Sequence, residues 1–110
     1  MDQAVVNQKY VYSRLAGAPD LGEIVDLFVA EMPERVATLL DELQAQDWES
    51  LRRTAHQLKG AAGSYGFDTI SPCAGKVESA IRDGEPEGRI RTTVEELVDL
   101  CNRTRCGLPG

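Results

Sequence analysis

His56 is the single histidine of this 110-residue chain, and it lies on a stretch with a strong helical pattern. A neutral imidazole nitrogen is a competent nucleophile near neutral pH and can accept a phosphoryl group. Lys59 follows three residues later, so on a helix it shares a face with His56. A phosphorylated side chain carries a charge of up to about −2, which an ammonium beside it would stabilise by about 1 kcal/mol or more. The pair therefore fits phosphoryl transfer to the imidazole.

The helix predicted over about residues 48–66 places His56 on its exposed side. At about 100° per residue, apolar side chains cluster on one side: Leu51, Ala55, Leu58, Ala62 and Tyr65. The opposite side carries Arg52, Arg53, His56, Lys59, Gly60 and Gly63. This pattern predicts an exposed histidine in a local basic patch, which Glu49 dilutes. An incidental surface histidine among solvated charges is the alternative.

Two glycines interrupt the exposed face of this helix. Gly60 and Gly63 each lie in the helix interior, where glycine costs roughly 1 kcal/mol relative to alanine. Close approach of a partner's backbone or of a bulky anion is a physical reason to retain them, and tight helix packing is the alternative reason. Gly66 is expected to serve such packing or to end the helix as a C-cap residue.

Apolar residues recur at spacings of three and four in three further stretches, which predicts three more helices. The first runs from an N-cap at Asp20 to about residue 43, with a kink or a break at Pro33. Its predicted apolar stripe consists of Leu21, Ile24, Val25, Phe28, Met32, Val36, Leu39, Leu40 and Leu43. Asp47 is the expected N-cap of the histidine helix.

The remaining two helices follow the histidine helix. A connection at residues 67–69 precedes an apolar stripe over residues 70–81, with Pro72 tolerated in the first turn. The run Asp-Gly-Glu-Pro at residues 83–86 is a strong stop signal. The last stripe covers residues 90–101.

Four amphipathic helices joined by short turns predict an all-α fold, an antiparallel four-helix bundle over residues 20–105. Residues 1–19 are expected to form a short helix or a cap over one end of the core, and residues 106–110 a flexible tail. Because all four stripes are used within one bundle, a monomer is expected.

The composition excludes several classes of function. The net charge of −6 argues against nucleic-acid partners and anionic membrane surfaces. The apolar stretches are shorter than the roughly 20 residues that a membrane span needs. Three cysteines, Cys73, Cys101 and Cys106, do not form a disulfide framework, so we expect reduced thiols in a cytoplasmic protein. A zinc site of His56, Cys73 and Cys101 lacks the usual ligand spacing, so no metal site is expected.

The segment AHQLKGAAGSYG, residues 55–66, closely resembles the AH-x-LKG-x-AG-x-x-G signature of histidine-containing phosphotransfer (HPt) domains. The similarity extends over about residues 20–105. Outside the signature it includes Phe28, Glu31, Met32, Pro33, Asp47, Trp48, Cys73, Glu78, Ala80, Arg82 and Gly84. The resemblance implies a module that takes a phosphoryl group from the phospho-aspartate of a receiver domain and often passes it to a second receiver.

The resemblance also implies roles for individual residues. His56 corresponds to the phosphorylated histidine, Lys59 to the phosphate-stabilising cation, and Gly60 to the glycine that admits the receiver. Glu78 falls where the family often has a Glu or Gln that hydrogen-bonds to the other ring nitrogen and orients the histidine. The expected receiver-docking residues are Arg52, Arg53, Gln57, Gly60 and Gly63.

The expected partners are response-regulator receiver domains, which bring their own Mg²⁺, or a hybrid histidine kinase. The chain has no phosphate-binding glycine loop and no second histidine, so we expect a carrier without a cofactor rather than an enzyme. Two alternatives stay open. One is a helical docking adaptor without phosphoryl chemistry, and the other is the HPt portion of a larger histidine kinase, phosphorylated directly by its ATP-binding domain.

Overall fold

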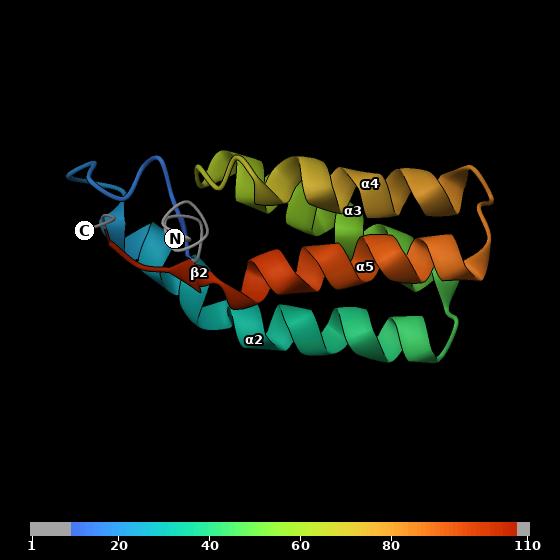
Figure 1. Ribbon diagram of the computed structural model, residues 1–110. Coiled ribbons are helices and arrows are strands. Elements are labelled where there is room, and N and C mark those ends of the chain that lie inside the picture. Colours follow the sequence, from blue (N-terminus) through green and yellow to red (C-terminus); the bar gives the residue numbers. More distant parts are fainter. Residues whose placement is uncertain (1–9, 108–110) are drawn as a thin grey trace, which may run out of the picture.

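Four helices account for most of the part of the chain that the structure describes, and each coincides with a helix predicted from the sequence. The computed structural model describes residues 10–107. The helices are α2 (Gly22–Gln44), α3 (Trp48–Ser64), α4 (Ile70–Arg82) and α5 (Glu87–Asn102). Two short strands, β1 (Val11–Tyr12) and β2 (Thr104–Arg105), flank them in the sequence (Figure 1). None of the helices within residues 10–107 has the length and apolar character needed to cross a membrane.

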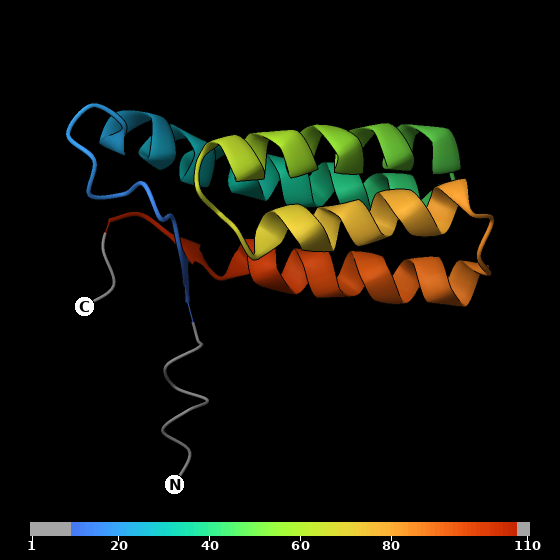
Figure 2. The ribbon, with the colours of Figure 1, turned by 90° about the horizontal axis from the view of Figure 1, so that it is seen from above.

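The helices lie side by side in a bundle around one core (Figures 1 and 2). α3 packs against α2 and α4, and α5 packs against the same two helices. The colour order in Figure 2 shows that the chain reverses direction at each connection between helices. The largest fully buried side chains are mainly aliphatic: Phe28, Phe67, Leu39, Leu51, Leu58, Ile70, Leu97, Val25, Val77, Val94 and Cys101.

α2 is one continuous helix, so the alternative of a break at Pro33 is wrong. Its N-terminal turns are inclined to the rest of the helix in Figure 1. The predicted cap at Asp20 is also wrong, because α2 begins after Leu21 and no side chain caps it. Ile24 and Leu40 of the predicted stripe are 41% and 42% exposed. They lie at the two edges of a stripe that is wider than the face covered by α3 and α5.

The N-terminus of α3 is capped as predicted. The backbone N–H of Ser50 donates to the carboxylate of Asp47 at 3.3 Å. This bond satisfies one of the backbone donors that a helix leaves free in its first turn.

The C-terminus of α3 is set by Gly66, which has a φ of 81°. Its N–H donates to the carbonyl of Gly63 at 3.3 Å, and the N–H of Phe67 donates to that of Ala62 at 2.8 Å. This pair of bonds is the Schellman motif, in which glycine takes the left-handed position. A Cβ at Gly66 would also lie 2.8 Å from Ser13 Oγ. The predicted C-cap role of Gly66 is therefore confirmed, although the helix ends two residues earlier than predicted. The close approach at Gly66 comes from the segment before α2 and not from another helix.

The connection between α3 and α4 contributes to the core. Phe67 is fully buried, and its ring stacks on that of Phe28 with centroids 5.1 Å apart. The run at residues 83–86 separates α4 from α5 as predicted.

The segment before α2 covers one end of the bundle. Residues 10–19 contain no helix, so the alternative of a short helix is wrong for this part. They form β1 and a series of turns, and Val11 and Leu15 pack against the core. β1 pairs in parallel with β2. Residues 1–9 and 108–110, which belong to the predicted cap and tail, lie outside the described residues.

Candidate functional site

The imidazole of His56 stands on the exposed face of α3. Its side chain is 61% exposed, as the helical pattern predicts. Nδ1 lies 2.8 Å from Oε2 of Glu78, which comes from the neighbouring helix α4. Among residues 10–107 the ring has no hydrogen-bond partner at Nε2. One ring nitrogen is therefore held by the protein while the other is free to react.

Glu78 is a buried carboxylate that contacts two groups at once. Its side chain is only 12% exposed, and its Oε1 lies 3.4 Å from Nζ of Lys59. Burial acts to raise the pKa of Glu78, but the hydrogen bonds and charges of His56 and Lys59 outweigh burial and lower this pKa below its usual value. Glu78 is therefore ionised near neutral pH and can only accept hydrogen bonds.

The ionised state of Glu78 selects the tautomer of His56. Because a carboxylate has no proton to donate, the bond to Glu78 Oε2 requires the hydrogen on Nδ1. In the neutral ring, Nε2 then carries the free lone pair. The arrangement supplies an oriented nucleophilic nitrogen on an accessible surface.

The site lies where α3 and α4 face each other in a regular register. The facing pairs are Gly63 with Ser71, Lys59 with Gly75, and His56 with Glu78. From one pair to the next, the residue number falls by four and then three on α3 and rises by four and then three on α4. Ser71 Oγ also donates to the carbonyl of Lys59 at 2.9 Å. The packing of the two helices thus determines which α4 residues reach the histidine.

The two glycines near His56 have different surroundings. A Cβ at Gly60 would have nothing within 4 Å, so this part of the α3 surface is open. A Cβ at Gly63 would lie 3.3 Å from Ser71 Oγ. The close approach of α4 therefore explains a glycine at position 63, in agreement with the alternative prediction of tight helix packing.

The predicted basic patch is partly neutralised by its own helix. Arg52 lies 2.7 Å and Arg53 3.5 Å from Oε2 of Glu49. Gln57, on the same helix, is exposed. The structure therefore brings His56, Lys59 and Glu78 together, whereas the predicted docking residues Arg52, Arg53 and Gln57 lie on the surface outside this cluster.

The cysteines lie outside this site. Cys73 and Cys101 are buried free thiols, as predicted, and burial raises the pKa of Cys101 to about 12. Burial raises the pKa of Cys73 as well. Both stay protonated near neutral pH, which makes them poor metal ligands.

Ser71 and Gly75 were not predicted from the sequence as neighbours of the site. Their signal was present, because Ser71, Gly75 and Glu78 are spaced four and three residues apart and so share one face of α4. That face could be related to His56 only once the packing of α4 against α3 was known.

Comparison with known families agrees with this geometry. The family whose model is described as Hpt domain matches residues 23–105, which is most of the chain. The chain belongs to the Hpt domain family. No curated protein and no solved structure matched the chain.

Membership in the family carries a general function. Hpt domains are phosphocarrier modules that act in phosphorelay histidine phosphotransfer, and they interact with receiver domains of response regulators. The resemblance noted in the signature at residues 55–66 is thereby confirmed at the level of the family.

Proposed function

We propose that His56 is the phosphorylated residue, and that it takes the phosphoryl group from the phospho-aspartate of one receiver and passes it to another. The observation that carries this proposal is the hydrogen bond between Nδ1 of His56 and the buried carboxylate of Glu78, at 2.8 Å. It fixes the ring and leaves Nε2 unprotonated on an exposed surface.

In the proposed step, Nε2 of His56 attacks phosphorus as the P–O bond to the receiver's aspartate breaks. The aspartate leaves as a carboxylate. The Nδ1 proton stays in place, so the ring gains a positive charge that faces Glu78. Most of the catalysis is positioning and charge stabilisation, with Mg²⁺ supplied by the receiver.

Lys59 stabilises the phosphoryl group in this proposal. Its side chain is 44% exposed, and its Nζ lies 3.4 Å from Glu78, the carboxylate that also holds Nδ1 of His56. An ammonium about 4 Å from a phosphoryl oxygen contributes from about 1 kcal/mol in water to a few kcal/mol in a partly desolvated interface. Docking of a receiver would exclude water and strengthen this contact.

The receiver would dock on the α3 surface around Gly60, flanked by Arg52, Arg53 and Gln57. Two exposed apolar side chains on α2 are further candidates for contact with the receiver, since Ile24 is 41% and Leu27 61% exposed.

Both side chains belong to the N-terminal turns of α2, which precede Pro33. We further propose that the protein acts as a monomeric cytoplasmic carrier without a cofactor of its own.

Transfer from receivers tests the proposal directly. Wild type and His56→Gln are incubated in parallel with receivers loaded with radiolabelled phosphate on aspartate, and separately with the ATP-binding domains of histidine kinases. We expect label that is acid-labile and alkali-stable on the wild type only, supplied by a receiver. Label supplied by a kinase domain alone would instead favour the HPt portion of a larger kinase. If no donor labels the wild type, the carrier function fails and the docking adaptor takes its place.

A further inference from the structure

The side chain of Lys59 leaves α3 and crosses α4 at Gly75. A Cβ placed at Gly75 would lie 3.3 Å from Cδ of Lys59, closer than an ordinary van der Waals contact. Beyond this point Nζ of Lys59 reaches Oε1 of Glu78 at 3.4 Å. The stem of Lys59 therefore occupies the space that a side chain at position 75 would fill.

We propose that Gly75 is a positioning residue for phosphoryl transfer, because its missing side chain is the passage by which Lys59 reaches Glu78 and the imidazole of His56. The inference rests on the proposed function of His56 and assigns a role to a residue outside the phosphotransfer signature at residues 55–66. It concerns how the cation is held, and Gly75 itself touches neither the imidazole nor the phosphoryl group.

The backbone gives no other reason for glycine at this position. Gly75 lies in the interior of α4, where glycine is disfavoured, and its φ is not in the left-handed region. The helical glycines Gly60 and Gly88 have nothing within 4 Å of an added Cβ. At Gly75, in contrast, an added Cβ would lie against the side chain of Lys59.

A side chain at position 75 would therefore act on Lys59 and not on the helix. The Cβ of alanine would displace Cδ of Lys59 by a few tenths of an ångström, while leucine would fill the passage and direct the ammonium into solvent. In solvent the attraction between ammonium and phosphoryl group is weaker, because the effective dielectric constant is higher. Alanine should at the same time stabilise α4.

The test uses the full chain and potassium phosphoramidate as donor, so that no receiver needs to dock. In this reaction the bond from Nε2 of His56 to phosphorus forms as the P–N bond of the donor breaks, and ammonia leaves. The variants are Gly75→Ala and Gly75→Leu, with Gly88→Ala as the matched control, each with Lys59 and with Lys59→Met. The rate of phosphohistidine formation, its half-life and the melting temperature are measured for each.

With Lys59 present, we expect the rate and the half-life to fall about twofold in Gly75→Ala and about tenfold in Gly75→Leu. Gly88→Ala should match the wild type. Gly75→Ala should melt about 2–6 °C higher than the wild type. In the Lys59→Met background the differences in rate and half-life between residues at position 75 should disappear, which a merely structural role would not produce.

Two results would overturn the inference while leaving the carrier function intact. One is a rate of phosphohistidine formation and a half-life in Gly75→Leu that equal those of the wild type. The other is a fall in rate and half-life on substitution of Gly75 that is just as large in the Lys59→Met background. If the wild type is not phosphorylated on His56 at all, the proposed function itself fails, and the role of Gly75 falls with it.

Discussion

Glu78 is the residue on which the proposed chemistry of the site depends most. Its two oxygens accept from Nδ1 of His56 at 2.8 Å and face Nζ of Lys59 at 3.4 Å. It therefore orients the imidazole of His56 and holds the ammonium of Lys59 with the same carboxylate. A buried carboxylate is tolerated here because both oxygens have partners.

Two substitutions of Glu78 should distinguish the effect of its charge from the effect of its hydrogen-bond acceptor on the rate of phosphorylation. Glu78→Gln keeps an acceptor for Nδ1 but loses the charge that stabilises the phosphorylated ring, so we expect phosphorylation to slow about fivefold to tenfold. Glu78→Ala also loses the acceptor and should slow it about tenfold to 100-fold. Initial rates with one receiver measure both, and Glu95→Gln on the exposed side of α5 is the control. Equal rates in all four proteins would show that Glu78 has no role in transfer.

The lowered pKa of Glu78 also predicts how stability depends on pH. A carboxyl whose pKa is lower in the folded than in the unfolded protein stabilises the fold above its unfolded pKa, about 4.3 for Glu. This contribution is lost as the pH falls through the lowered pKa of Glu78. The difference in free energy of unfolding between wild type and Glu78→Gln, measured by urea titration, should shrink below about pH 4. A difference that grows on acidification would contradict the assigned direction.

At the scale of the elements, α2, α3 and α4 end in the same hydrogen-bonding motif. The left-handed position is held by Gly66 after α3 and by Gly84 after α4, with φ of 81° and 71°. After α2 it is held by Gln46, with φ of 56°. A side chain in this region is disfavoured by about 1 kcal/mol. The short turn between α2 and the histidine helix therefore contains a local strain that the other two turns avoid.

Exchanging residue types at these turns should move stability in opposite directions. Gln46→Gly should raise the free energy of unfolding by about 0.5–1 kcal/mol, the gain being reduced by the extra freedom of glycine in the unfolded chain. Gly84→Ala should lower it by about 1 kcal/mol, since an added Cβ there meets nothing and only the backbone is affected. Urea unfolding measures both, and a loss of stability in Gln46→Gly would be inconsistent with this explanation.

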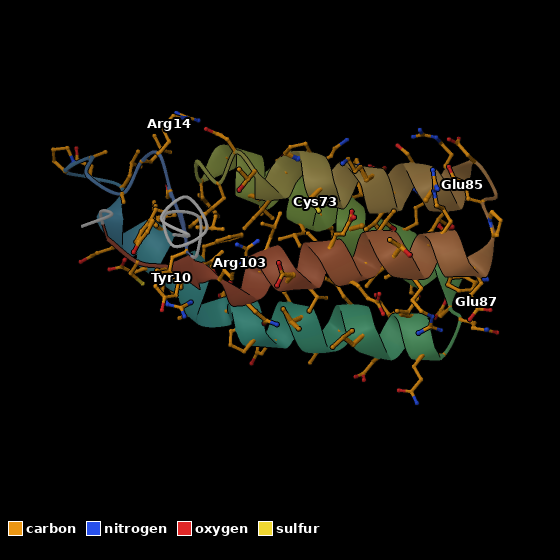
Figure 3. All side chains as sticks on the ribbon, viewed as in Figure 1. Tyr10, Arg14, Cys73, Glu85, Glu87 and Arg103 are labelled. Carbon is orange, nitrogen blue, oxygen red and sulfur yellow. The ribbon has the colours of Figure 1, made fainter. Side chains whose placement is uncertain are left out.

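At the scale of the whole molecule, the segment before α2 ties one end of the bundle together. Ser13 is 4% exposed, and its hydroxyl donates to the carbonyl of Tyr65 and accepts from the N–H of Leu15. Arg14 forms an ion pair with Asp68 at 2.9 Å. Figure 3 shows Arg14 at the opposite end of the molecule from Glu85. The segment thus secures the end where α3 passes into α4.

Removing the Ser13 hydroxyl should loosen this end. Ser13→Ala leaves a backbone N–H and a carbonyl without their partner, which lowers the free energy of unfolding by about 1–3 kcal/mol. Thr92→Ala is the control, because its hydroxyl bonds to the carbonyl of Gly88 on an exposed turn. Calorimetry should show a lower melting temperature for Ser13→Ala than for the wild type. The rate of phosphorylation should be unchanged. An unchanged melting temperature would mean that the segment does not contribute to stability.

Much of this architecture could be predicted from the sequence, because burial imposes a helical period on the apolar residues. That period located all four helices and the exposed face of His56. Contacts between helices could not be predicted in this way. Gly75 and Ser71 lie next to α3 because of how the helices pack, and the period of one helix does not contain that information. The burial of Phe67 in a connection, and the pairing of β1 with β2, likewise depend on the assembled bundle. The hydrogen bond between His56 and Glu78 was predicted from the family resemblance.

In the proposed reaction, Glu78 reserves Nδ1 of His56 and leaves Nε2 to carry the phosphoryl group. Because the chain has one histidine, nitrogen-15 labelling of histidine gives the spectrum of a single imidazole. The measurement is the coupling between phosphorus and the ring nitrogens after phosphorylation by a receiver. We expect coupling to Nε2, with the proton retained on Nδ1. Coupling to Nδ1, or a phosphorylated protein whose imidazole is unmodified, would contradict it.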